Sequence, residues 1–152
     1  RDSAGEKGLK TARAIGMVTY RSFNSYAATQ TEVDMNVVDD FKASSYIHYQ
    51  GQKLVNRFNA FSYWTLTKAM DSHNIARGRE ETVDKVLQKL PQKALLIGIS
   101  NDILCPASEL KKMAEQMSNA TYKEINSLYG HDGFLIETKA ISELILHWLK
   151  RK

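Results

Sequence analysis

The feature that most constrains the fold of this 152-residue chain is a short, unbroken apolar run from Ala94 to Ile99. Such a run is typical of a strand that is buried on both faces of a parallel sheet. Pro106 suits the first turn of a following helix, Thr121 to Asn126 is a second, weaker strand, and apolar spacing predicts a final amphipathic helix over 141–149. Residues 93–152 therefore predict the order β-α-β-α, which indicates an α/β fold.

Two strands are too few to form a stable open sheet that is covered on both faces. The predicted strands therefore need further strands from outside residues 93–152. Without them, apolar faces and strand edges would be exposed, so we expect the 152-residue chain alone to be unstable or self-associating.

The first 90 residues predict helices rather than strands. Apolar spacing predicts helices over 8–22, 54–69 and 80–90, and a weaker one over 37–52 that Gly51 interrupts. The polar stretch from Ser22 to Asn36 has no clear period and is expected to be a loop. We therefore divide the chain into a helical region, residues 1–92, and a mixed region, residues 93–152.

Two residues suited to proton transfer follow the predicted strands. Asp102 comes just after the first strand, and His131 follows the second, in a loop set between Gly130 and Gly133. Because catalytic groups of open α/β sheets gather at the carboxyl ends of the strands, we expect the two side chains to meet. A carboxylate that is hydrogen-bonded to one ring nitrogen of a histidine fixes the tautomer of that histidine. The alternative is that Asp102 caps a helix and His131 is a turn residue, but their joint placement favours catalysis.

The sequence offers no clear nucleophile to complete a triad. In α/β-hydrolases the order is Ser, then Asp or Glu, then His, and Gly98-Ile99-Ser100 begins like the G-x-S-x-G elbow. However, Asp102 stands where the second glycine is required. Cys105 is expected to be a small buried side chain rather than an activated thiolate. We expect no metal site, because the histidines lack ligand-like spacing; they are His48, His73, His131 and His147.

Charge and composition argue against two classes of partner. The formal net charge is +4, but the 21 Lys and Arg residues are interspersed with 17 acids, which is typical of a solvated surface. With no basic face or known module, we expect no nucleic-acid binding. No stretch approaches the roughly 18 apolar residues of a membrane span, and residues 1–10 lack the apolar segment of a secretory signal. The single Cys105 fits a reducing compartment, so we expect a cytoplasmic protein without membrane contact.

A family likeness runs from about Gly8 to the end of the chain, in many segments that keep one order. The segments are Gly8-Leu9, Ala12-Arg13, Thr19-Tyr20-Arg21-Ser22, Tyr49 to Val55, Arg57 to Ala60, Leu66 to Asp71, Arg77-Gly78, Gly98 to Pro106 and Tyr129 to Glu137. In them the chain resembles the C-terminal part of the homoserine O-acetyltransferases, which are α/β-hydrolase-fold acyltransferases of methionine biosynthesis. The resemblance implies a partial α/β-hydrolase fold, in which residues 1–92 match the helical lid and residues 93–152 match the last part of the core. The N-terminal core strands and the nucleophile elbow are expected to precede Arg1.

The resemblance also implies a ping-pong reaction. A serine takes the acetyl group from acetyl-CoA and passes it to the γ-hydroxyl of homoserine. His131 matches the family's general base and acid, and Asp102 matches the carboxylate that orients it. Because the serine lies outside this chain, the chain alone is expected to be inactive.

By the same resemblance, Arg13, Tyr20 and Asp132 match the residues that hold the amino-acid substrate. A separation of seven residues is about two helical turns, so Arg13 and Tyr20 are expected to share a helix face. A guanidinium there can pair with a carboxylate, and Asp132 with an ammonium. The bare sequence alone would make Arg13 and Tyr20 an ordinary surface pair.

The expected partners follow from the family. They are homoserine and acetyl-CoA, the latter as a co-substrate, with no bound cofactor. The family's lid helices form a homodimer interface, and the aromatic run of Phe58, Phe61, Tyr63 and Trp64 is compatible with one, although a buried core face explains it as well. The sequence leaves two choices open: whether the acyl donor carries an acetyl or a succinyl group, and whether the acceptor is homoserine or serine.

Two other functions stay open at this point. One is a non-catalytic helical interaction fragment that merely retains ancestral residues, which the absent nucleophile would support. The other is an esterase of the same fold that passes the acyl group to water. Homoserine-dependent transfer, measured against hydrolysis, separates the esterase from the transferase.

Overall fold

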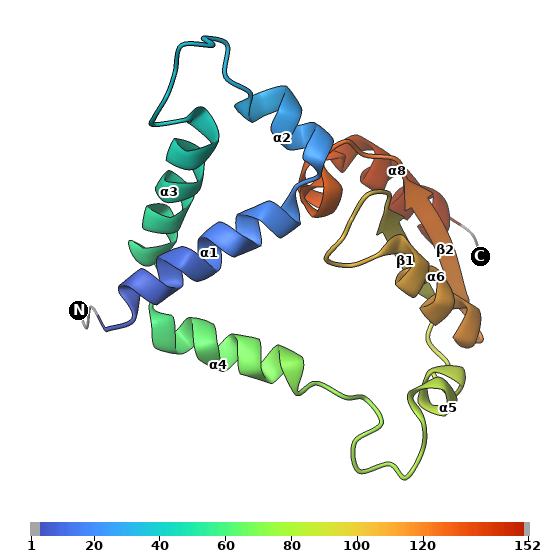
Figure 1. The fold of residues 1–152 in the computed structure, drawn as a ribbon. Helices are drawn as coiled ribbons and strands as arrows, with labels where there is room; N and C mark the ends of the chain where they lie inside the picture. Colours follow the sequence, from blue (N-terminus) through green and yellow to red (C-terminus); the bar gives the residue numbers. More distant parts are fainter. Residues whose placement is uncertain (1–3, 151–152) are drawn as a thin grey trace. The chain divides into compact units, whose positions relative to one another are not determined.

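A computed structural model describes residues 4–150 (Figure 1). The elements follow in the order α1 (Glu6–Tyr20), α2 (Phe23–Gln30), α3 (Lys42–Val55), α4 (Ala60–Asp71), α5 (Val83–Gln88), β1 (Ala94–Ile99), α6 (Ala107–Gln116), β2 (Ala120–Ile125), the 3-10 helix η1 (Gly130–Asp132), α7 (Gly133–Ile136) and α8 (Thr138–Leu149). No helix within residues 4–150 is both long enough and apolar enough to cross a bilayer.

The chain forms two compact units. The helical unit comprises the residues up to Thr19 together with Phe23–His73, and the sheet unit comprises Tyr20–Ser22 together with the residues from Asn74 onward. Compactness defines these units, whereas the change from helical to strand patterning set the predicted boundary between residues 92 and 93. That boundary therefore stays a prediction.

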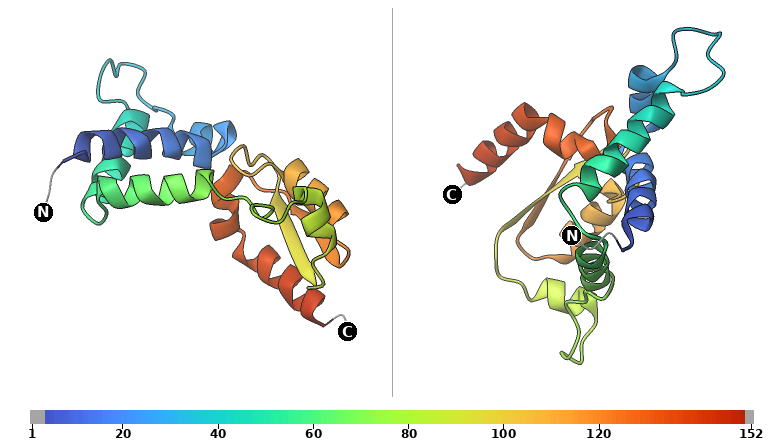
Figure 2. Two further views of the ribbon diagram at one scale, coloured as in Figure 1. Left: turned by 90° about the horizontal axis from the view of Figure 1, so that it is seen from below. Right: turned by 90° about the vertical axis from the view of Figure 1, so that its left-hand side faces the viewer.

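The sheet unit has the predicted β-α-β-α order. β1 and β2 pair in parallel, from Ala94 opposite Ala120 to Ile99 opposite Ile125. Both α6 and α8 contact both strands, and Figure 2 shows these two helices on opposite sides of the sheet. Parallel strands need a crossover connection, and α6 provides it. The sequence thus predicted the architecture of this unit correctly.

The strand β1 is less buried than its composition predicts. Residues 94–97 are half-buried, and only Gly98 and Ile99 at the carboxyl end are buried. The expected burial on both faces is therefore wrong for this chain, because the sheet has only two strands among the described residues. The buried end is the one that carries the candidate site.

The helical unit contains a helix that the sequence analysis missed. The stretch expected to be a loop contains α2, which contacts α3. The hydroxyl of Tyr26 on α2 donates to the backbone oxygen of Met17 at 3.0 Å, and its ring packs edge-on against Tyr46 at 6.5 Å. The side chains that stabilise α2 are thus distant in sequence, and its own sequence lacks an apolar period.

A second correction concerns residues 54–69, which do not form one helix. α3 ends at Val55, and Asn59 begins α4 by accepting a hydrogen bond from the backbone N–H of Ser62 at 2.8 Å. Asparagine is a strong N-cap residue. The apolar spacing misled the prediction because Leu54 and Phe58 both pack in one core, although Phe58 lies between α3 and α4, whereas Phe61 on α4 is 74% exposed. That core contains Leu9, Leu54 and Val55, with Phe58, Ala60 and Tyr63 around them.

Gly51, predicted to interrupt its helix, lies inside α3. A Cβ at this position would lie 3.2 Å from the backbone oxygen of Lys10 on α1. The glycine therefore lets the two helices approach each other closely without ending α3.

Candidate active site

Asp102 lies in the turn that follows β1, and hydrogen bonds fix its carboxylate. One oxygen, Oδ1, accepts the backbone N–H groups of Leu104 at 2.9 Å and Cys105 at 2.8 Å. The Asp102 side chain is only 5% exposed. Because a buried carboxylate needs hydrogen-bond donors, these two N–H groups stabilise Asp102 and leave Oδ2 as the oxygen that faces a partner.

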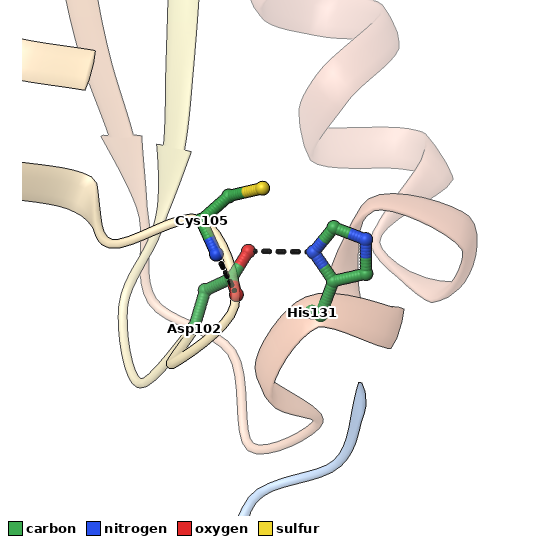
Figure 3. A group of neighbouring side chains, drawn as sticks. All are labelled: Asp102, Cys105 and His131. Atoms are coloured by element: carbon green, nitrogen blue, oxygen red, sulfur yellow. Dashed lines mark hydrogen bonds and ion pairs between the residues drawn. The ribbon is translucent and has the colours of Figure 1, made fainter. Parts of the chain in front are cut away.

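That partner is His131, which lies in η1 after β2 (Figure 3). Its Nδ1 is 2.9 Å from Oδ2 of Asp102, and the ring is 24% exposed. The ring also contacts Tyr20 at 5.5 Å and Phe134 at 5.2 Å between centroids. The structure thus brings together the two residues that the sequence placed after consecutive strands, and Nε2 is the ring nitrogen left to meet a reactant.

Polar contacts hold the two site loops to each other. The hydroxyl of Ser100, after β1, donates to the side chain of Asn126 at 2.9 Å and accepts the backbone N–H of Ser127 at 3.1 Å. Asn101 donates to the backbone oxygen of Ser127 at 3.3 Å. Ser100 is a loop residue, as expected, and the buried Ser127 is a site-supporting residue that the sequence analysis did not find.

The segment Tyr20–Ser22 belongs to the sheet unit and contacts the His131 loop. Nε of Arg21 donates to Oδ2 of Asp132 at 3.3 Å, and the hydroxyl of Ser22 donates to the backbone oxygen of Leu128. Both side chains of the Arg21–Asp132 pair are about one-fifth exposed, at 21% and 20%. Arg21 was not singled out from the sequence, because nothing local indicates a partner 111 residues away.

Gly130 allows this close approach. Its φ is +61°, and a Cβ would lie 2.9 Å from the backbone nitrogen of Ser22. Gly78 has a similar φ of +71° but no neighbour within 4 Å of a Cβ. A Cβ at Gly78 would therefore carry only the conformational strain of a positive φ. A Cβ at Gly130 would carry that strain and a steric clash with the backbone of Ser22 as well.

We expect Gly130→Ala to destabilise the full-length protein by about 2–4 kcal/mol, because it combines left-handed strain with a backbone clash. The matched variant Gly78→Ala should cost about 1 kcal/mol, since it carries the strain alone. Urea unfolding of the two variants measures the difference. Equal losses would show that the Tyr20–Ser22 segment does not press on Gly130.

The remaining predicted substrate-binding residue is Arg13. It lies on α1, half-buried, in the helical unit, whereas Tyr20 at the end of the same helix is counted with the sheet unit. Tyr20 and Asp132 therefore lie with His131 in one unit. The relation of Arg13 to them stays a prediction.

Cys105 differs from its expected role as a buried side chain, because the residue is exposed. Even so, partial burial of the thiol, and next the charge of Asp102, raise its pKa. A raised pKa keeps the thiol protonated near neutral pH, which disfavours Cys105 as a nucleophile. The sulfur nevertheless lies close to the pair: one donor atom each of Asp102, Cys105 and His131 lie within 4.8 Å of one another.

Comparisons with known proteins show which sequences and folds this chain is similar to. No family model matches the sequence. The homoserine O-acetyltransferase of Cyclobacterium marinum is 49% identical over 142 residues, which are 93% of this chain and 40% of that protein. The enzyme of the same name from Salinibacter ruber is 40% identical over 149 residues, or 97% of this chain and 42% of that protein. This chain is a homologue of the C-terminal portion of the homoserine O-acetyltransferases.

Solved structures agree with that homology. The homoserine O-acetyltransferase of Staphylococcus aureus matches with a TM-score of 0.78 and 32% identity, over 98% of this chain and 43% of that one. Esterase E22 matches with a TM-score of 0.83 at 15% identity, over 99% of this chain and 44% of that one, which shows a common fold alone. The predicted family resemblance and the partial α/β-hydrolase fold are confirmed. The chain spans about 40% of the length of the curated homoserine O-acetyltransferases that it matches.

Proposed function

We propose that the complete protein is a homoserine O-acetyltransferase that uses acetyl-CoA, and that this chain supplies its histidine and aspartate. The observation that carries the proposal is the 2.9 Å contact between His131 Nδ1 and Asp102 Oδ2 at the carboxyl ends of two parallel strands. Homology to enzymes of that name supports the choice of reaction. The chain alone lacks the serine that the family's triad requires, and we propose that it is inactive by itself.

In the proposed mechanism, His131 moves one proton in each half-reaction. Asp102 accepts the Nδ1 proton in a hydrogen bond, which leaves Nε2 free to take the proton of the attacking serine. As the acetyl group forms an ester with the serine, Nε2 returns the proton to the departing thiolate of CoA. In the second half, Nε2 takes the proton of the homoserine γ-hydroxyl and returns it to the serine as the product ester forms. Asp102 stabilises the imidazolium at both stages.

The substrate contacts are proposed from family likeness and supported by the local chemistry. Asp132 is a carboxylate next to His131, where it suits the ammonium of an amino acid. Its Oδ2 accepts Arg21, but a carboxylate has about four acceptor sites, so Oδ1 remains for a substrate. Tyr20 contacts the His131 ring and can form one side of the site where homoserine binds. Arg13 is proposed to pair with the substrate carboxylate.

We further propose a homodimer formed through the lid helices. The predicted aromatic run divides between two roles: Phe58 and Tyr63 pack on the core of the helical unit, whereas Phe61 and Trp64 on α4 are 74% and 56% exposed. Exposed aromatic side chains of this size are enriched in interfaces.

A cytoplasmic location and the absence of a bound cofactor stay predictions from the sequence.

Intact mass measurement of the full-length protein tests the proposed reaction. After incubation with acetyl-CoA, we expect a gain of one acetyl group, which homoserine removes with formation of its O-acetyl ester. Discharge at the same rate without homoserine would instead support the esterase. A protein that never acquires the acetyl group would favour the non-catalytic interaction fragment.

A further inference from the structure

We propose that Asp102, Cys105 and His131 together bind a thiophilic divalent cation such as Zn²⁺ or Cd²⁺. Each residue contributes one donor atom, and these atoms lie within 4.8 Å of one another. Figure 3 shows the three side chains converging from the turn after β1 and from η1. The four histidines have no ligand-like spacing, so a search by sequence spacing misses a site assembled from two loops.

The separations are close to those of a real coordination shell. Zn–S bonds of about 2.3 Å and Zn–N bonds of about 2.0–2.1 Å place sulfur and nitrogen about 3.5 Å apart in a tetrahedron. The 2.9 Å between Oδ2 and Nδ1 must widen by a few tenths of an ångström, to about 3.3 Å. The sulfur must move inward by about 1.3 Å at most, from the 4.8 Å limit to about 3.5 Å, and a rotation of the exposed Cys105 side chain can supply this movement.

The carboxylate is already oriented for a ligand. Two backbone N–H groups hold Oδ1 of Asp102, so Oδ2 is directed at the space shared with His131 and Cys105. Hydrogen bonds of this kind orient the carboxylates of metal sites and contribute to their affinity. Three protein ligands would leave one coordination position for water, as in open zinc sites.

The donor set also selects the class of metal. A thiolate and an imidazole suit borderline-soft ions such as Zn²⁺, whereas Mg²⁺ and Ca²⁺ prefer shells made only of oxygen. The Asp102 carboxylate and the Cys105 thiolate would together neutralise a divalent charge. On binding, the thiol proton passes to solvent as the metal–sulfur bond forms, and no atom is oxidised or reduced.

Occupation of this site would inhibit the enzyme, a consequence that rests on the proposed function. The cation takes the place of the proton between Nδ1 and Oδ2, so the ring proton moves to Nε2. An Nε2 that already carries a proton cannot accept one from the serine, which is the fault expected of the wrong histidine tautomer. The binding itself requires no activity.

Cadmium titration of the full-length protein tests the binding directly. We expect the ultraviolet charge-transfer band of a cadmium–sulfur bond in the wild type and its loss in Cys105→Ser, which keeps the backbone N–H that Asp102 needs. The difference between the two spectra isolates this cysteine from any other. Calorimetry with Zn²⁺ should show an affinity lower by on the order of 100-fold in Cys105→Ser, since even outer hydrogen bonds contribute 10–100-fold. Mg²⁺ serves as the hard-ion control and should not compete.

Two outcomes would overturn the site. One is the absence of a Cys105-dependent band in the wild type. The other is an unchanged band and affinity in both Asp102→Asn and His131→Gln, which would mean that the sulfur binds alone; circular dichroism checks that these variants are folded. If the acetyl transfer itself is not found, the proposed function fails while the band still decides the site. If transfer is found, Zn²⁺ should inhibit the wild type and spare Cys105→Ser.

Discussion

Replacing His131 with alanine in the full-length protein should lower kcat for acetyl transfer by on the order of 10⁵–10⁶-fold, as for the histidine of other triads. In this structure no other histidine pairs with a carboxylate among residues 4–150. Without the imidazole, the serine has no acceptor for its proton and the thiolate of CoA has no donor. Intact mass should accordingly show no acetyl-enzyme on the timescale of wild-type turnover.

His147→Ala is the matched control for that variant. His147 is exposed in the last turn of α8, within the same sheet unit. Its replacement should leave kcat unchanged. Substantial activity in His131→Ala, or an equal loss of kcat in His147→Ala, would contradict the assignment of His131 as the base.

The sheet unit was predictable because its signals are local. The bounds predicted for β1 agree with the structure, and β2 begins one residue earlier than predicted. Both strands follow from runs of adjacent residues, and site residues of open α/β sheets gather at the carboxyl ends of the strands. For that reason Asp102 and His131 could be paired from their order alone, before any distance was known.

The helical unit and the supports of the site were less predictable because their signals are distant. α2 is stabilised by contacts with residues elsewhere in the chain, such as the contact of Tyr26 with Tyr46, and the sequence of α2 does not indicate these contacts. Arg21 meets Asp132 only after the chain has folded. The break before α4 is a different case: Asn59 is a recognisable cap, and the apolar period was wrongly given more weight than that cap.

Cys105 shows the limit of assigning burial from residue type. Free cysteines are among the most buried residues, so a buried side chain was the reasonable expectation. In the turn after β1, the backbone N–H of Cys105 instead donates a hydrogen bond to Asp102, and the Cys105 side chain is exposed at the edge of the site. A residue can thus be fixed by its backbone while its side chain stays available for other chemistry.

Asp102→Asn should lower kcat by on the order of 10⁴-fold in the full-length protein. The structure gives the reason. The backbone N–H groups of Leu104 and Cys105 need an acceptor at Oδ1, so the asparagine oxygen must take that place and its NH₂ group must face His131. Nδ1 then becomes an acceptor, the ring proton moves to Nε2, and His131 cannot accept a proton from the serine.

This substitution separates the two roles considered for Asp102. Asparagine accepts backbone N–H groups as well as aspartate does, so a residue that only caps its turn would tolerate the change. The matched control is Asp84→Asn, which removes a charge at an exposed position in the first turn of α5 and should not alter kcat. Near-wild-type kcat in Asp102→Asn would reduce Asp102 to a structural cap. A loss of about 10⁴-fold with unchanged urea stability would instead assign it to orienting His131.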